Sequence, residues 1–200
     1  MQPKKLAVKL LLRQNICSID TDLFRLDCRG HIIIDSVQHY AQSVHRDPRD
    51  FIGEGIAECV VFPRRGRHLI LYNDWILSSA RKRWSIAHEI GHICCCHTED
   101  GPEQETQAND FAAELLMPQI VLREAISAGL ISNAQDAASL FRVSLQAAQN
   151  QLRSANSLHH FGDLDYQLLQ KYLPLIKSEI SEPIVTIPYQ NFYSRSMSIL

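Results

Sequence analysis

Two histidines four residues apart enclose a glutamate in the segment His88-Glu89-Ile90-Gly91-His92. If this segment is helical, residues four apart lie on one face, and two imidazoles there can hold one metal ion from the same side. Neutral imidazole nitrogen suits Zn²⁺, which it binds at about 2.0–2.1 Å. Glu89 projects about 100° around the helix from His88, so it can stand beside the metal and accept a proton from bound water. This arrangement is typical of metal-assisted peptide-bond hydrolysis.

The residues around this motif favour a helix that buries one side. The segment from Arg83 onward contains no proline, and its apolar residues recur at helical spacing. These residues are Trp84, Ala87, Ile90 and Ile93. Gly91 lies between the two histidines, where glycine costs a helix about 1 kcal/mol. We therefore expect the backbone of another element to pass close to Gly91.

A second helix is predicted at residues 103–118, between the turn Gly101-Pro102 and the helix-ending Pro118. Its small alanines permit close approach to the first helix. A catalytic zinc site needs a third protein ligand and one open position. Three acids on this helix compete for that place by spacing alone: Glu103, Glu105 and Glu114. Acids in a first helical turn are also ordinary partners of the helix dipole, so spacing leaves the choice open.

Together the two segments resemble the ImmA/IrrE metallopeptidases. The resemblance covers roughly residues 58–118. It is carried by the His-Glu-Ile-Gly-His motif and by the pattern Glu105-x-x-Ala108-Asn109-x-Phe111-Ala112-Ala113-x-Leu115-Leu116-Met117-Pro118. The resemblance implies a zincin-like fold, and site-specific cleavage of a repressor that carries a helix-turn-helix domain. It also implies a repressor gene nearby, and hence a part in transcription regulation and in a mobile element.

The same resemblance assigns individual residues. It implies one zinc ion held by His88, His92 and Glu105, with Glu89 as the general base. Asn109 lies one helical turn after Glu105 and is expected to orient its carboxylate. Many members have a second glutamate directly before the Ala-Asn pair, where this chain has Gln107.

The residues before the motif predict a small sheet. Strands are expected at residues 31–35, 58–62 and 68–72, the last two joined as a hairpin, and a helix is expected at residues 36–46. An edge strand of this sheet can pair with an extended substrate, or it can be only part of the sheet. Basic residues flank these elements and are interpreted as solvated turn and helix-start charges, in preference to a site for acidic substrates. They are Arg64, Arg65, Arg67, Arg81, Lys82 and Arg83.

Three consecutive cysteines follow the motif and do not suit a disulfide framework. In a reducing cytosol, Cys94, Cys95 and Cys96 are interpreted as small buried hydrophobic residues. Cys95 and Cys96 would approach the metal only if the helix continued, and packing at the helix end is the preferred interpretation. His97 is interpreted as a solvated histidine at the helix end. The oxyanion donor besides zinc is unassigned, with Tyr72 and His97 as the only candidates.

Residues 121–128, 132–141 and 145–152 are predicted helices, and the last two form a helix-turn-helix pattern. A DNA-reading helix usually carries basic and amide groups. Residues 145–153 hold amides but one basic residue, so neutralisation of DNA phosphates would be weak. Direct nucleic-acid binding is therefore not expected. Residues 165–176 are predicted to be helical until Pro174 interrupts them, and residues 183–189 are predicted to be extended.

Composition agrees with a small enzyme. The 200 residues are 46% hydrophobic and carry a formal net charge of −2, so no strong basic field draws the chain to nucleic acid or membrane. Residues 1–13 only weakly resemble a signal peptide, because Lys9 interrupts the apolar run and Arg13 ends it. No run approaches the roughly 18 apolar residues of a transmembrane helix. A cytoplasmic protein is expected.

We therefore expect an α+β, zincin-like metallopeptidase with a small β-sheet, a mostly helical body and a helix-turn-helix-like unit after the active site. The expected divisions are residues 1–125 for the peptidase domain, with residues 1–30 poorly defined, 126–160 for the helix-turn-helix-like unit, and 161–200 as a segment of unknown role. The expected function is zinc-dependent cleavage of a helix-turn-helix repressor. The alternative is a non-proteolytic regulator that binds DNA or sequesters a repressor.

Overall fold

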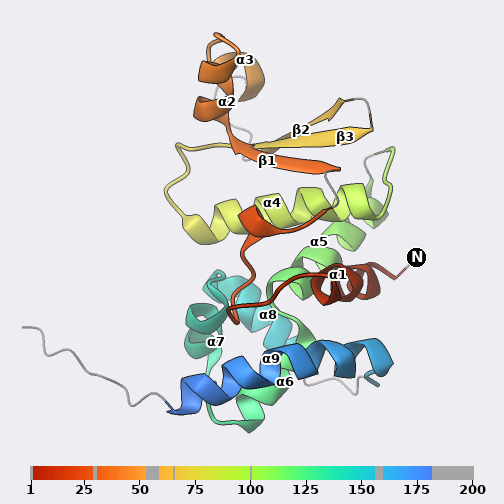
Figure 1. Cartoon of the computed structure of the whole chain (residues 1–200), viewed down its shortest axis with the longest axis vertical. Helices are drawn as coiled ribbons and strands as arrows, with labels where there is room; N and C mark the ends of the chain where they lie inside the picture. The colour runs from red at the N-terminus through yellow and green to blue at the C-terminus, as the bar shows by residue number, and fades with distance from the viewer. Residues whose placement is uncertain are drawn as a thin grey trace, which may run out of the picture.

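A three-stranded mixed sheet lies across a long helix, α4 (Ser79–Cys94), at one end of the molecule (Figure 1). The computed structural model describes residues 2–28, 31–52, 59–64, 66–99, 101–155 and 160–181. Strand β1 (Ile32–Ser36) pairs in parallel with β3 (Arg67–Tyr72), and β2 (Cys59–Arg64) pairs antiparallel with β3. The expected hairpin is therefore present, although residue 58 lies outside the described residues.

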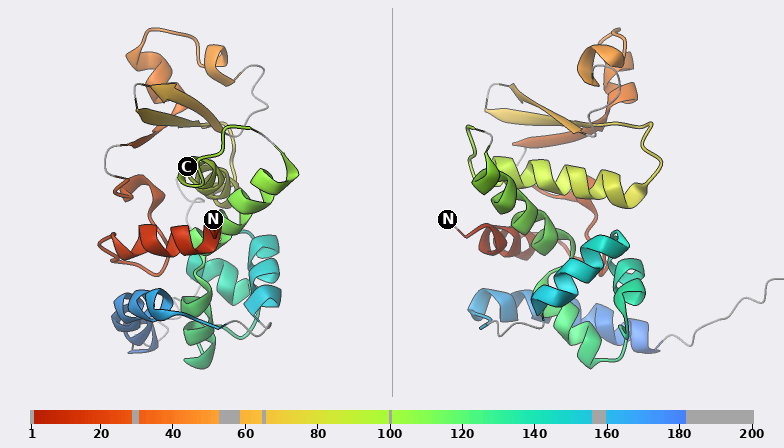
Figure 2. Two further views of the ribbon diagram at one scale, coloured as in Figure 1. Left: turned by 90° about the vertical axis from the view of Figure 1, so that its right-hand side faces the viewer. Right: turned by 180° about the vertical axis from the view of Figure 1, so that it is seen from behind.

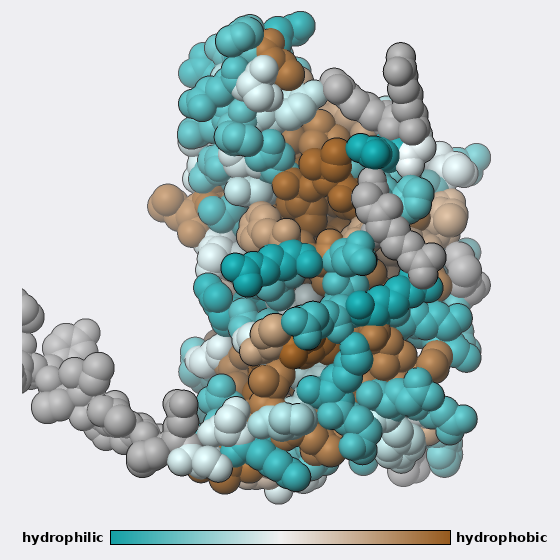
Figure 3. All heavy atoms as spheres, viewed as in Figure 1, coloured by the Kyte–Doolittle hydropathy of each residue, from teal (hydrophilic) through white to brown (hydrophobic). Residues whose placement is uncertain are grey.

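The central strand β3 alternates between two hydrophobic clusters, as a strand covered on both faces must. Ile70 belongs to the main core with Ile86 and Ile90 of α4. Leu69 and Leu71 point to the opposite face and join the cluster beneath α2 (Val37–Ser43) and α3 (Arg49–Ile52). Figure 3 shows apolar atoms gathered over the sheet on the face drawn there. Helix α2 ends at Ser43, three residues before its predicted end.

Helix α5 (Pro102–Leu116) packs directly against α4, and this contact confirms the expectation for Gly91. A Cβ atom added at Gly91 would lie 3.0 Å from the carbonyl oxygen and 3.1 Å from the Cα atom of Ala108. The close approach of the α5 backbone therefore requires glycine at position 91, although glycine lowers the stability of helix α4.

The N-terminal residues, which the sequence left poorly defined, form α1 (Pro3–Leu12) and a short 3₁₀ turn, η1 (Leu23–Arg25). Helix α1 packs on α5 and on α9 (Asp163–Ser181). Its apolar residues Val8 and Leu11 are almost fully buried. Lys171 of α9 donates to the carbonyl oxygens of Leu12 and Gln14 at 2.6 and 2.7 Å, which satisfies acceptors at the end of α1.

Pro174 does not interrupt the last described helix, so that prediction was wrong. Helix α9 continues through it to Ser181. Proline costs a helix interior about 3 kcal/mol. Leu168, Tyr172 and Ile176 on both sides of Pro174 are at most 2% exposed, and burying an apolar face stabilises a helix more than propensity does. Residues 183–189, predicted to be extended, lie outside the described residues.

Helices α6 (Gln119–Ser127), α7 (Ala134–Phe141) and α8 (Leu145–Ala155) gather at the end of the molecule away from the sheet (Figure 2). Asn133 and Asp136 form a capping box at the start of α7. Arg142 ends α7 in the left-handed conformation with φ 52°. Helices α7 and α8 pack together as the predicted helix-turn-helix-like unit.

Buried Arg83 joins this unit to α4 and corrects the interpretation of Arg83 as a solvated charge. Its guanidinium donates to the carbonyl oxygens of Thr21 at 2.9 Å, Arg142 at 3.2 Å and Phe141 at 3.5 Å. Two of these acceptors lie at the end of α7, where a cation is favoured. Burial lowers the pKa of Arg83 from its ordinary value, and three carbonyl acceptors compensate the desolvated charge. The side chain of Arg64 and residue 65 lie outside the described residues.

No helix in the described part of the chain is both long enough and apolar enough to cross a membrane.

Candidate metal centre

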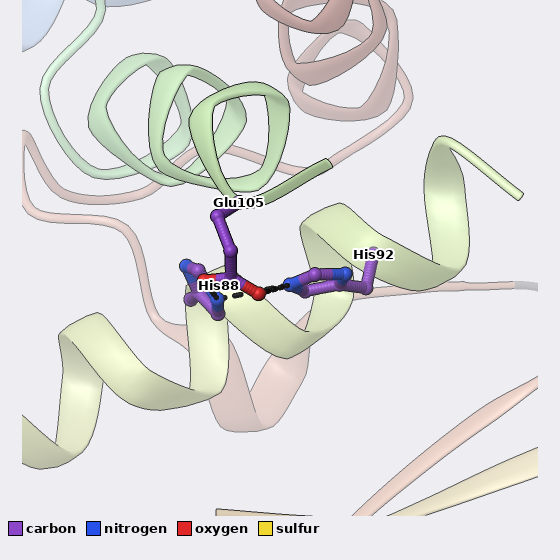
Figure 4. A group of neighbouring side chains, drawn as sticks. All are labelled: His88, His92 and Glu105. Carbon is purple, nitrogen blue, oxygen red and sulfur yellow. Dashed lines mark hydrogen bonds and ion pairs between the residues drawn. The ribbon is translucent and has the colours of Figure 1, made fainter. Parts of the chain in front are cut away.

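Three side chains from two helices meet at one point (Figure 4). The i, i+4 spacing of His88 and His92 places both imidazoles on the same side of α4. Their Nε2 atoms are 2.9 Å apart. Glu105, in the first turn of α5, points toward them, and its carboxylate oxygens lie 3.3 Å from each Nε2 atom. The structure therefore brings together the three residues expected to bind the metal.

The protonation pattern of these groups suits a cation. The Nδ1 atom of His88 lies 3.0 Å from the Oδ1 atom of Asn109. An amide oxygen only accepts, so Nδ1 carries the hydrogen and the Nε2 atom of His88 presents a lone pair. The ionised carboxylate of Glu105 also only accepts. Acceptors that converge without a donor between them are stabilised by a metal ion, and two imidazoles plus one carboxylate are a common donor set for one.

Asn109 corrects one expectation. It was expected to orient Glu105, but it contacts His88 across the helix pair. Residues 105 and 109 lie on the same face of α5, which faces α4. The side chain of Asn109 therefore reaches the imidazole of His88 instead of the carboxylate of Glu105. Asn109 therefore fixes the orientation and tautomer of one imidazole.

The two rival acids lie away from this point. Glu103 accepts a hydrogen bond from Gln107 Nε2 at 3.0 Å. Glu114 is nine residues after Glu105, which places it on the opposite side of α5. It is 4% exposed, and its Oε1 atom accepts from the backbone N–H of Gln119 at 3.1 Å.

Glu89 lines a cleft of about 240 Å³ beside the histidine pair. The cleft also contains Cys59 of strand β2, Trp84, Ser85, His88 and Asn109. Glu89 follows His88 directly on α4, about 100° further around the helix, and both residues line this cleft. A carboxylate in this position can exchange a proton with a water or substrate held next to the metal ligands.

Neither candidate for an oxyanion donor, Tyr72 or His97, lines this cleft. Tyr72 stacks edge-on against Phe24, and its pKa is raised by burial and by the nearby charges of Asp74 and Asp35. It is absent from the residues that line the cleft. His97 is not a solvated helix-end histidine, because both ring nitrogens have partners. Its Nδ1 atom lies 3.0 Å from His92 Nδ1, and its Nε2 atom lies 3.0 Å from Gln107 Oε1.

The consecutive cysteines do not approach the metal ligands. Helix α4 ends at Cys94, and none of the three belongs to the metal-binding group found among the described residues. Burial raises the pKa of Cys94 to about 12, and Cys95 is 8% exposed. These two fit the expected apolar packing, whereas Cys96 is exposed and does not.

Two histidines and a glutamate on α4, beneath a small mixed sheet, and a second glutamate from α5 define a zincin-like metallopeptidase. The family model described as IrrE N-terminal-like domain (Peptidase_M78) matches residues 21–153. The chain belongs to this family, which confirms the resemblance to ImmA/IrrE proteins. No curated protein matches the chain.

Proposed function

We propose that the protein is a zinc-dependent endopeptidase that cleaves a helix-turn-helix repressor in the cytoplasm and thereby relieves repression. The observation that supports zinc is the donor set. His88, His92 and Glu105 supply the three protein ligands that a catalytic zinc site requires, and His88 also lines the cleft that contains Glu89. When bound, zinc would polarise the peptide carbonyl and lower the pKa of a water molecule from about 15.7 toward about 7.

Residues of the protein itself transfer the proton, orient a zinc ligand and position the substrate. Glu89 accepts the proton of the attacking water and passes it to the leaving amine. Asn109 holds the ring of His88. Strand β2 lies at one edge of the described sheet and contributes Cys59 to the cleft. An extended peptide can pair with such an edge, which would carry its scissile bond past Glu89.

The test replaces the proposed base and leaves every proposed ligand in place. Glu89→Gln keeps the size of the side chain but removes the carboxylate, so zinc and the repressor should bind while cleavage slows at least 10²-fold. The protein is co-expressed with a helix-turn-helix repressor encoded beside it, and the repressor is followed on gels. Glu99→Gln, an exposed acid beyond the end of α4, is the matched control.

Two results would oppose the proposal. If Glu89→Gln relieves repression as well as the unmodified protein, proteolysis is not the mechanism. Sequestration of a repressor, or DNA binding through residues 134–153, then becomes the better account. If neither the unmodified protein nor Glu89→Gln cleaves any candidate repressor while both bind zinc, the proposed substrate class is wrong. The assignment as a peptidase would then remain without a repressor substrate.

A further inference from the structure

The end of α4 turns back sharply and returns His97 to the metal ligands. Cys96 adopts a left-handed conformation with φ 58°. The N–H of Cys96 donates to the carbonyl of Ile93 at 3.1 Å, and the N–H of His97 donates to the carbonyl of His92 at 3.0 Å. These are the two hydrogen bonds of a Schellman motif. The motif places the His97 ring against His92, with centroids 5.0 Å apart and planes at 80°.

From there a chain of hydrogen bonds runs outward to α5. Gln107 Oε1 faces His97 Nε2 at 3.0 Å, and Gln107 Nε2 donates to Glu103 Oε1 at 3.0 Å. A carboxylate accepts only, so it selects the amide nitrogen of Gln107 and turns the amide oxygen toward His97. The donor and the acceptor of each of these hydrogen bonds are therefore fixed.

These donor and acceptor roles determine which ring nitrogens of His97 and His92 carry hydrogen. Because Gln107 Oε1 only accepts, His97 carries its hydrogen on Nε2 and, when neutral, presents a lone pair on Nδ1. His92 Nδ1, 3.0 Å away, must then be the donor. The Nε2 atom of His92 is left as a lone pair directed at His88 Nε2 and Glu105.

We propose that His97 and Gln107 are positioning residues that hold His92 in its metal-binding tautomer and orientation. This inference rests on the proposed metal site. Histidine ligands usually donate their second ring N–H to a carboxylate, carbonyl or water. Here His88 uses Asn109 directly, whereas His92 uses a relay through His97, Gln107 and Glu103. Helix α5 thus provides one ligand and determines the tautomers of the other two.

The competing explanation is that His97 only fills space at the end of α4. Two substitutions distinguish these explanations. His97→Asn places an amide oxygen near the position of the imidazole Nδ1 atom and can still accept from His92. His97→Leu fills a similar volume but has no acceptor. A space-filling residue tolerates leucine better than asparagine, and a positioning residue has the opposite preference.

The experiment measures zinc affinity of the full chain by competition with a chromophoric chelator. We expect His97→Leu to weaken zinc binding by about 10- to 100-fold, the usual scale for such partners. We expect His97→Asn to restore most of the affinity. In the zinc-loaded protein, the ¹H–¹⁵N signal of His92 Nδ1–H should be protected from exchange, lost in His97→Leu and kept in His97→Asn.

A second pair of variants acts one step further out. Gln107→Leu removes the acceptor for His97 and should weaken zinc binding. Gln104→Leu, the same replacement on the same helix turn, is the control and should have no effect. If His97→Leu fails to fold, as judged by circular dichroism of the metal-free chain, the comparison of Gln107→Leu with Gln104→Leu decides.

The outcomes separate this inference from the proposed function. A wild-type chain that takes up no zinc contradicts the proposed function. A wild-type chain that binds zinc while His97→Leu binds it equally tightly contradicts the relay. The relay is also contradicted if His97→Asn is as weak as His97→Leu, or if Gln107→Leu behaves like Gln104→Leu.

Discussion

At the scale of single residues, the candidate centre is defined by which atoms can donate and which can only accept. Asn109 and the carboxylate of Glu105 both present acceptors, and together they leave the His88 Nε2 lone pair directed at the same point as the carboxylate. Such a cluster is unfavourable without a positive charge at its centre. A metal ion supplies that charge, and the ligand residues should therefore depend on one another for affinity.

The first prediction concerns the third ligand. Glu105→Ala should abolish tight zinc binding, because it removes the only carboxylate within reach of both Nε2 atoms among the described residues. Elemental analysis of the unmodified chain should give about one zinc per chain, and the variant should give far less. Glu99→Ala is the control, since that exposed acid lies beyond the end of α4 and outside the cluster. Equal zinc content in the Glu105 variant would exclude this residue as a ligand.

Single residues also show where sequence reasoning succeeded and where it could not. His88, Glu89 and His92 follow from spacing on a helix, and Glu105 was chosen from three acids only through the family resemblance. His97 was misinterpreted because its position depends on the backbone of Cys96. The left-handed residue that ends a helix is usually glycine, so a cysteine at position 96 does not predict this turn. The sequence around Cys96 therefore contains no residue that predicts the turn bringing His97 to His92.

At the scale of elements, the spacing between α4 and α5 determines the geometry of the centre. Glu105 reaches the histidines only because the backbones approach closely at Gly91 and Ala108. The helices themselves were predictable, since apolar residues recur at helical spacing and prolines stand at Pro102 and Pro118. The continuation of α9 through Pro174 could not be predicted, because the burial of Tyr172 and Ile176 arises only in the assembled core.

The second prediction tests this spacing. Gly91→Ala adds a methyl group 3.0 Å from a carbonyl oxygen and 3.2 Å from the Cβ atom of Phe111, so α5 must shift. Overpacking costs about 1–3 kcal/mol, and the improved helix propensity returns about 1 kcal/mol. We expect a net loss of about 1 kcal/mol in unfolding free energy, measured by urea denaturation. We also expect weaker zinc binding, because Glu105 moves with α5.

The comparison variant for Gly91→Ala is Ser85→Ala, which also changes a residue of α4 but adds no atom. Its zinc affinity should remain close to that of the unmodified chain. If Gly91→Ala leaves zinc affinity unchanged, the position of Glu105 does not depend on the close approach of the two backbones.

At the scale of the whole molecule, helices from distant parts of the chain enclose one carboxyl group. Glu114 of α5 accepts from Gln119 at the start of α6 and lines a cavity of about 690 Å³. The starts of α1 and α9 line the same cavity. Burial raises the pKa of Glu114 from 4.5 to about 7, against the Gln119 hydrogen bond and the charge of Lys4, which lower it. The sequence offered Glu114 only as a possible ligand, because its burial arises when α1 packs on α5 in the assembled molecule.

The final prediction follows from the direction of this shift. The unfolded chain releases the Glu114 proton near pH 4.5, whereas the folded chain keeps it until about pH 7. The proton therefore stabilises the folded state at low pH, and this stability is lost as the pH rises through that interval. Glu114→Gln cannot ionise. Its unfolding free energy relative to wild type should therefore increase by about 2–3 kcal/mol between pH 5 and pH 8. Urea denaturation with a chelator present, so that metal binding does not contribute, measures this change. Glu99→Gln, an exposed acid, should show no comparable increase. A constant difference for Glu114→Gln across this range would mean that Glu114 ionises at the same pH in both states, and that the helices around it leave it solvated.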